Sequence, residues 1–343
     1  MTSQAVGAMN GRSRTEDGRE VTAPQRVAEA RARITGQVVG RERELDLILA
    51  AVAAGRDLLL EGPPGTSKST LLRAITADWG IPLVFVEGNA DLTPAKLVGH
   101  HNPARVLRED YSPENFVDGP LLEAMREGGF LYIEEFNRAP EDTINTLLTA
   151  MAEREVAVPR VGRVTARPTF RVIASMNPFD NVGTTRLSTS VHDRLCRLAV
   201  TYQDEEAELG IVTLRAGLPG EFGERALAEL AGSLRRDAVA VTRATRVHPD
   251  VRQGSSVRGA IDLTLVAGEL LGLRGIGESG GTGPAGAGNA ARTAYAETVF
   301  DAMVVALSGR IHLDETVDAT PESVLRQIWE DHFVLDPATA APG

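Results

Sequence analysis

The residues best suited to chemistry stand together from Glu61 to Thr70, where the chain reads EGPPGTSKST. A Gly- and Pro-rich turn follows an apolar run here and leads into the helical pattern LLRAI. Backbone N–H groups of such a turn and of the following helix N-terminus converge on phosphate groups. Lys68 would supply charge to the β- and γ-phosphates, and the Ser69 hydroxyl would coordinate Mg²⁺. The stretch therefore predicts a phosphate-binding loop.

The predicted nucleotide-binding residues of this loop are Gly62, Pro63, Pro64, Gly65, Thr66, Ser67, Lys68, Ser69 and Thr70. Ser67 stands where the pattern GxxxxGK(S/T) has its second glycine. Because serine is small, we expect it to keep a backbone conformation that does not require φ > 0. The alternative is an ordinary strand–turn–helix connection with a surface lysine. Lys68 and Lys96 are the only two lysines among 36 Lys and Arg residues. Because lysine is so scarce in this chain, a lysine at this position argues against an ordinary surface residue.

Two carboxylates end another apolar run, FLYIEE at 130–135. A nucleotide hydrolase needs one acid near the metal ion and a second to polarise the attacking water. Successive strand residues point to opposite sides, so the two acids can serve different roles. We assign Glu134 to Mg²⁺ and Glu135 to water activation; the alternative is a solvated strand end.

Three further polar residues are candidates by their positions. Asn177 follows the apolar run RVIAS and could hydrogen-bond the γ-phosphate or the attacking water. Arg194 precedes the last apolar run, and Arg258 lies near a helix start in GSSVRG. Guanidinium groups so placed could stabilise transition-state charge, from the next subunit or from a lid.

Short apolar runs separated by helical periodicity indicate an α/β fold, a parallel sheet with crossover helices. The predicted strands are 57–61, 83–86, 130–133, 171–174 and 197–200. Glu141 to Ala152 has helical spacing after Pro140, and two extended stretches around 159–162 indicate a hairpin. Beyond about Asp204 strand runs stop, and Ala/Leu/Glu/Arg-rich stretches predict a helical domain.

These patterns predict the following organisation: a disordered tail at 1–23, an α/β nucleotide-binding domain at 24–203, a helical lid domain at 204–335 with a flexible Gly-rich loop at 275–288, and a tail at 336–343.

Composition narrows the function classes. Lys+Arg 36 against Asp+Glu 47 gives a net charge of -11, which argues against a polyanion as the main partner. A single cysteine, Cys196, leaves no internal disulfide or Cys-based metal cluster. No apolar run approaches a membrane span, and the N-terminus lacks a signal-peptide core. We therefore expect a cytoplasmic protein without nucleic acid as its main partner.

In this order the motifs resemble the AAA+ ATPases, and within them the MoxR family, over about 24–335. The resemblance rests on GPPGTSKST, FLYIEE, VIASMNP, GTTRLSTSVHDRL and GSSVRG. It implies a parallel-sheet P-loop core with a C-terminal helical lid, ATP/ADP as ligand and Mg²⁺ as cofactor. The residue roles it implies are adenine packing for Val38, Val39 and Gly40, sensor 1 for Asn177, a trans arginine finger for Arg194 and sensor 2 for Arg258. It also implies two inserted segments, a helix-2 insert at 99–120 and a pre-sensor-1 hairpin at 155–170.

The resemblance also implies partners. Family members form hexameric rings and act as chaperone-like ATPases on client complexes, often with a von Willebrand factor A domain protein. Glu134 departs from the usual Asp, and slow hydrolysis is one possible consequence. Two alternatives stay open: the ATPase subunit of a metal chelatase, and a nucleotide-dependent assembly factor such as those of gas vesicles. A nucleic-acid motor is least favoured.

Five arginines on the predicted hairpin leave two readings open. They could grip an acidic or nucleic-acid substrate in a ring pore, or they could pair with Glu153 and Glu155 or be solvated. These residues are Arg154, Arg160, Arg163, Arg167 and Arg171. Lys96, at a predicted helix start after Thr93-Pro94, has no role that its position indicates.

Overall fold

The computed structural model describes residues 13–14, 20–21, 23–109, 111–178, 187–217, 225–276 and 289–333. It divides into two compact units, Met1–Thr201 and Tyr202–Gly343, each of which we describe by itself. Most of the predicted tail at 1–23, most of the Gly-rich loop at 275–288 and the whole tail at 336–343 lie outside the described residues.

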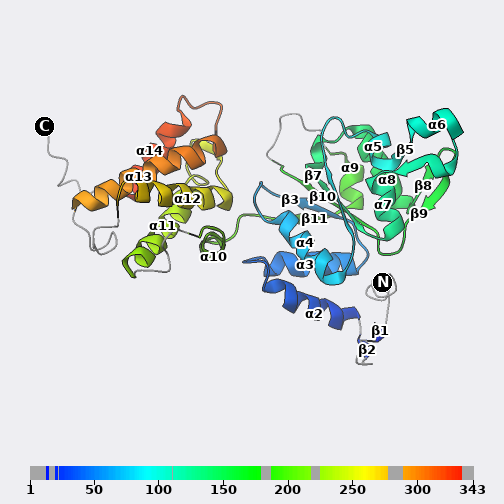
Figure 1. Cartoon of the computed structure of the whole chain (residues 1–343), viewed down its shortest axis with the longest axis horizontal. Coiled ribbons are helices and arrows are strands. Elements are labelled where there is room, and N and C mark those ends of the chain that lie inside the picture. Colours follow the sequence, from blue (N-terminus) through cyan, green and yellow to red (C-terminus); the bar gives the residue numbers. More distant parts are fainter. Residues whose placement is uncertain are drawn as a thin grey trace. The chain divides into compact units, whose positions relative to one another are not determined.

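A five-stranded sheet, parallel throughout, forms the centre of the first unit and confirms the predicted α/β class (Figure 1). Its order is β11-β3-β10-β7-β4. The strands are β3 (Leu58–Glu61), β4 (Leu83–Glu87), β7 (Phe130–Glu134), β10 (Arg171–Met176) and β11 (Cys196–Ala199). Because β3 lies between β10 and β11, the loop that follows β3 starts beside the carboxyl ends of both.

Helices flank this sheet, and alternate residues of its inner strands build two cores. In β7, Leu131 and Ile133 join one apolar cluster, whereas Phe130 and Tyr132 join the other. The helices are α2 (Ala23–Thr35), α3 (Glu42–Ala53), α4 (Lys68–Trp79), α5 (Pro94–Val98), α7 (Pro120–Glu127), α8 (Glu141–Glu153) and α9 (Thr189–Arg194). The helix predicted after Pro140 is thus confirmed as α8.

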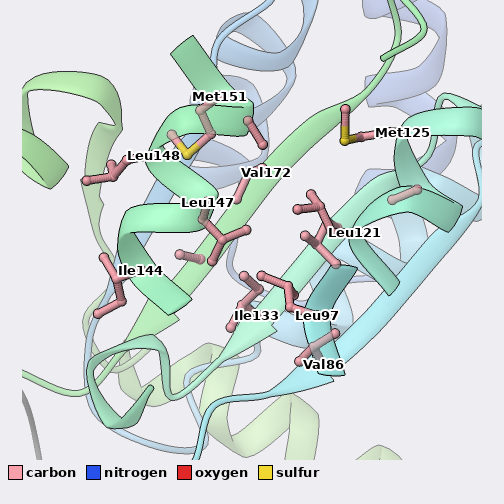
Figure 2. Close-up of a cluster of buried hydrophobic side chains, with 14 of the residues drawn as sticks. Val86, Leu97, Leu121, Met125, Ile133, Ile144, Leu147, Leu148, Met151 and Val172 are labelled. Atoms are coloured by element: carbon pink, nitrogen blue, oxygen red, sulfur yellow. The ribbon is translucent and has the colours of Figure 1, made fainter. Parts of the chain in front are cut away.

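Each core belongs to one set of helices. Residues of α2, α3 and α4 pack in the cluster that contains Tyr132. Residues of α5, α7 and α8 pack in the other cluster, where Figure 2 shows Leu147 and Leu121 beside the sheet residues Ile133 and Val172. Helix α4, which follows the predicted phosphate-binding loop, therefore covers the face of the sheet that carries the Tyr132 side chain.

Small antiparallel elements interrupt the α/β pattern. One group consists of β5 (Gly99–His101), α6 (Pro103–Glu109), a 3₁₀ turn at Pro113–Asn115 and β6 (Phe116–Asp118), with β5 paired to β6. The hairpin of β8 (Glu155–Val158) and β9 (Gly162–Thr165) precedes β10. β1 (Ser13–Arg14) pairs with β2 (Glu20–Val21).

The second unit is mainly helical, with α10 (Glu205–Arg215), α11 (Arg225–Ala244), α12 (Val257–Leu273), α13 (Asn289–Leu307) and α14 (Pro321–His332). One expectation is wrong here. Strands do not stop at residue 204, because β12 (Val251–Gln253) pairs antiparallel with β13 (His312–Leu313). Both strands are too short to show a period-2 pattern. Within the described ranges no helix is long and apolar enough to span a bilayer.

Intramolecular contacts engage most of the arginines on and beside the hairpin. Arg154 donates to the buried Asp57 carboxylate at 2.7 Å, and Arg163 pairs with Glu155 at 2.5 Å. Arg171 is buried in β10, where it donates to two backbone carbonyls. Arg160 stacks on the Tyr111 ring at 4.6 Å. Arg163 thus has the expected partner Glu155, whereas Arg154, Arg160 and Arg171 have partners that were not expected. These contacts argue against an arrangement in which all five arginines grip a substrate.

Leu147→Ala tests the core of the first unit. Leu147 is fully buried, so we expect the substitution to lower the free energy of unfolding by about 3 kcal/mol through lost transfer energy and a cavity. The matched control is Leu107→Ala, because Leu107 is 88% exposed and should cost less than about 0.5 kcal/mol. Urea titration of both variants measures the difference; equal midpoints would contradict the packing described.

Candidate functional site

The predicted phosphate-binding loop occupies residues 62–67, between β3 and α4. The Gly62 N–H donates to the Met176 carbonyl at 3.0 Å. A Cβ added to Gly62 would stand 1.9 Å from the Val200 carbonyl oxygen, so no side chain fits there. Gly65 has φ of 76°, a left-handed value that favours glycine. The loop therefore needs both glycines, one for a close approach and one for backbone conformation.

Lys68 is bound by the loop that it follows. Its side chain is buried, and Nζ donates to the carbonyls of Gly62 and Pro63, both at 2.9 Å, and to Thr66 Oγ1 at 3.2 Å. The Thr66 hydroxyl in turn donates to the Pro63 carbonyl at 3.0 Å. The ammonium group is thus held among loop atoms, where it can meet a phosphate that binds the loop N–H groups. A lysine this buried is not the surface lysine of the alternative reading.

Ser67 corrects one expectation. Its φ is 64° and its ψ is 19°, so it adopts the left-handed conformation that the second glycine of the pattern favours. Small size does not relieve this requirement, because the Cβ of any L-residue is crowded at positive φ, at a cost of about 1–2 kcal/mol. The loop keeps the geometry of the pattern and carries strain at Ser67.

The predicted metal ligands meet at the end of β7. The Ser69 hydroxyl donates to Glu134 Oε1 at 3.0 Å. A hydroxyl and a carboxylate oxygen are the hard ligands that Mg²⁺ prefers, so this donor set fits the ion. The longer side chain of Glu134, relative to Asp, does not prevent its carboxylate from reaching Ser69.

Tyr132 adjoins both predicted ligands. Its hydroxyl lies 3.2 Å from Ser69 Oγ, 3.0 Å from Ser175 Oγ and 3.5 Å from Glu134 Oε1. Burial is the main reason why the pKa of Tyr132 is raised, so its hydroxyl keeps its proton at neutral pH. The residues around the predicted cation site therefore form one hydrogen-bonded group.

Glu135 has a different environment from Glu134. It follows β7 with φ of 53°, a left-handed conformation, and its carboxylate pairs with Arg138 at 3.1 Å. Its side chain is 41% exposed. A Cβ on Gly88, at the end of β4, would stand 2.3 Å from the Glu135 carbonyl oxygen. The strained backbone is thus packed in place, with a carboxylate open to water, as a general base requires.

The remaining candidates occupy four other places. Asn177 follows β10 directly and is partly buried, one residue after the carbonyl that Gly62 binds. Val38 is buried and Gly40 has φ of 63° in the turn between α2 and α3. Arg194 is exposed at the end of α9, where it donates to the Ser190 carbonyl at 3.2 Å. Arg258 belongs to the second unit, as the exposed second residue of α12.

Three residues beside the site were not among the sequence-based candidates. Tyr132 stands two residues before Glu134, hence on the same strand face, and this spacing could have indicated it. Arg138 stands three residues after Glu135. Arg41, next to Gly40, is buried, pairs with Glu44 at 3.1 Å and donates to the Thr201 carbonyl at 2.7 Å. No pattern in the sequence indicates this last contact, which spans 160 positions.

Comparison with known proteins gives a family match and relatives. The model of the AAA domain, dynein-related subfamily, matches residues 57–195. The gas vesicle ATPase GvpN of Ancylobacter aquaticus is 28% identical over 237 residues, 64% of this chain and 62% of that protein. Protein MoxR of Paracoccus denitrificans is 34% identical over 176 residues, 51% of this chain and 50% of MoxR.

A third relative is similar over more of its length. The uncharacterised protein YeaC of Bacillus subtilis is 30% identical over 248 residues, 67% of this chain and 74% of that protein. The chain thus spans less than two thirds of the named gas vesicle and MoxR relatives and about three quarters of YeaC.

Ser67→Gly tests the strain in the loop. Glycine removes the cost of the left-handed conformation, and this gain exceeds the larger entropy of the unfolded glycine chain, so we expect stabilisation of about 0.5–1 kcal/mol. Ser188→Gly is the matched control, because Ser188 has φ of -69° and no side-chain cap bond; it should be slightly destabilising. Urea titration distinguishes them, and a destabilised Ser67→Gly variant would contradict the strain.

Proposed function

The chain belongs to the AAA+ ATPases of the MoxR type, and from this premise we propose that it hydrolyses ATP with Mg²⁺ in an oligomeric ring to remodel a partner protein complex. The proposal rests on one observation. The neighbouring residues Lys68 and Ser69 of α4 donate to Gly62, just after β3, and to Glu134, at the end of β7. A cation for phosphate and oxygen ligands for a metal ion stand in one site, as phosphoryl transfer requires.

In the proposed reaction the loop N–H groups and Lys68 bind the β- and γ-phosphates. Ser69 and Glu134 would hold Mg²⁺, which supplies positive charge to the phosphate oxygens. Glu135 orients the attacking water and polarises it for attack on the γ-phosphorus. Asn177 adds a hydrogen bond to that water or to the γ-phosphate. The Glu135–Arg138 ion pair must loosen for this step, because a carboxylate held by arginine is a weaker base.

Two arginines complete the proposal, although no contact described above joins either of them to the predicted site. Arg194 would act from the neighbouring subunit of the ring, which its exposure at the end of α9 permits. Arg258 would act from the helical unit, and Val38, Val39 and Gly40 would pack near the adenine. We propose a hexamer, with a von Willebrand factor A domain protein among its partners; both follow from the family resemblance.

A second candidate is a nucleotide-dependent assembly factor, and the similarity to a gas vesicle ATPase favours it. Replacing the vesicle ATPase of Ancylobacter aquaticus with this chain tests it. Restored buoyant vesicles would support the assembly role, and their absence, with the chain expressed and folded, would favour remodelling of another client. The chelatase alternative stays a hypothesis, which a requirement for a porphyrin-binding subunit would support.

Glu135→Gln tests the chemistry. The amide cannot accept a proton, so we expect steady-state hydrolysis to fall by about 10²–10⁴-fold, while ATP affinity stays within about two-fold of wild type. Glu127→Gln, an exposed position at the end of α7, is the matched control and should hydrolyse ATP at the wild-type rate. Phosphate release and nucleotide titration measure both quantities. Wild-type turnover in Glu135→Gln would refute the proposed role.

A further inference from the structure

The group around Tyr132 carries an inference beyond the roles assigned so far, although it rests on the proposed function. Four side-chain oxygens from three segments lie in a row: Ser175 of β10, Tyr132 and Glu134 of β7, and Ser69 of α4. The successive distances are 3.0 Å from Ser175 to Tyr132, 3.2 Å from Tyr132 to Ser69 and 3.0 Å from Ser69 to Glu134. All are ordinary hydrogen-bond lengths for hydroxyl groups or slightly longer.

Counting protons gives this row a direction. Each hydroxyl has one proton and two lone pairs, and an ionised carboxylate only accepts. The Ser69 proton goes to Glu134 Oε1, so the contact between Ser69 and Tyr132 must use the Tyr132 proton, which has Ser69 Oγ at 3.2 Å as its nearer acceptor and Glu134 Oε1 at 3.5 Å as its farther one. The contact between Tyr132 and Ser175 must then use the Ser175 proton. The chain of donors therefore runs from Ser175 through Tyr132 and Ser69 to Glu134.

This direction gives the Ser69 hydroxyl a second fixed partner besides Glu134. One Ser69 lone pair accepts from Tyr132, and the Ser69 proton faces Glu134. The second lone pair remains for a cation. Tyr132 is fully buried, so water does not compete for its hydroxyl, and its rigid ring determines where that proton points.

We propose that Tyr132 is a positioning residue for the Mg²⁺ ligands, whose hydroxyl orients Ser69 between Glu134 and the cation. Glu134 has one more rotatable bond than Asp, and Tyr132 on the same face of β7 confines it through Ser69. Tyr132 does not touch substrate; it acts through Ser69.

Nucleotide affinity measured with and without metal tests this proposal in the full chain. The probe is ATPγS, titrated calorimetrically in excess Mg²⁺ and in EDTA. The dissociation constant in EDTA divided by that in Mg²⁺ is the ratio that measures the contribution of the metal. We expect Tyr132→Phe to lower this ratio about five-fold, the effect of one lost hydrogen bond, and to leave affinity in EDTA unchanged. An unchanged ratio, or an equal loss in EDTA, would overturn the proposal.

Two variants separate positioning from packing. Tyr295→Phe also removes a buried tyrosine hydroxyl, one that donates to Asp237 Oδ2 at 2.6 Å in the second unit, and it should keep the wild-type ratio. In a Ser69→Ala background, Tyr132 has lost the hydroxyl through which it acts, so Tyr132→Phe should have no further effect. A further five-fold loss in that background would contradict the proposal.

Ser175→Ala keeps the experiment decisive if Tyr132→Phe does not fold. It removes the donor to the Tyr132 oxygen, and with it a contact that holds the Tyr132 hydroxyl in place, so the ratio should fall, by less than in Tyr132→Phe, and no change would count against the proposal. Affinities of the wild type show whether the proposed metal site itself fails or only the role of Tyr132. If its affinity is the same in Mg²⁺ and EDTA, the proposed metal site fails; if Mg²⁺ raises affinity and neither variant changes the ratio, only the role of Tyr132 fails.

Discussion

The close approach of Gly62 to the neighbouring strand ends is the constraint on which the site depends. Its N–H is bound to the Met176 carbonyl, and its Cα faces the Val200 carbonyl with no room for a methyl group. This approach places the start of the phosphate-binding loop against β10 and β11. Because Asn177 follows Met176 directly, the same contact brings Asn177 to the loop that holds Lys68.

Two residues of the site have backbone conformations that L-residues rarely adopt. Ser67 and Glu135 have φ of 64° and 53° and flank the Ser69–Glu134 pair in sequence, one in each segment. Such conformations persist only where surrounding packing fixes them, and they are concentrated at functional sites. At Glu135 the packing comes from Gly88, whose missing side chain makes room for the Glu135 carbonyl. The fold thus accepts backbone strain at two residues of the predicted site.

Much of this arrangement could be predicted from the sequence because it depends on local patterns. The apolar runs predict the strands, and the position of Lys68 after a Gly- and Pro-rich turn predicts the loop. The contacts of Arg41 with Thr201 and of Arg154 with Asp57 could not be predicted, because they join segments far apart in the chain through buried polar groups. The backbone conformation of Ser67 was wrongly predicted. The prediction considered only the size of the side chain, whereas the loop imposes a left-handed conformation at this position.

We propose above all that Lys68 binds the phosphates of ATP in this loop. Its ammonium is already held by three oxygen atoms of the loop, of Gly62, Pro63 and Thr66, so it is oriented before a nucleotide arrives. The most direct test is the dissociation constant of ATP in the presence of Mg²⁺ for the wild type and for Lys68→Ala. We expect affinity to fall by at least about ten-fold in Lys68→Ala, because a charge-assisted contact is lost. Equal affinity in a folded Lys68→Ala protein would contradict it.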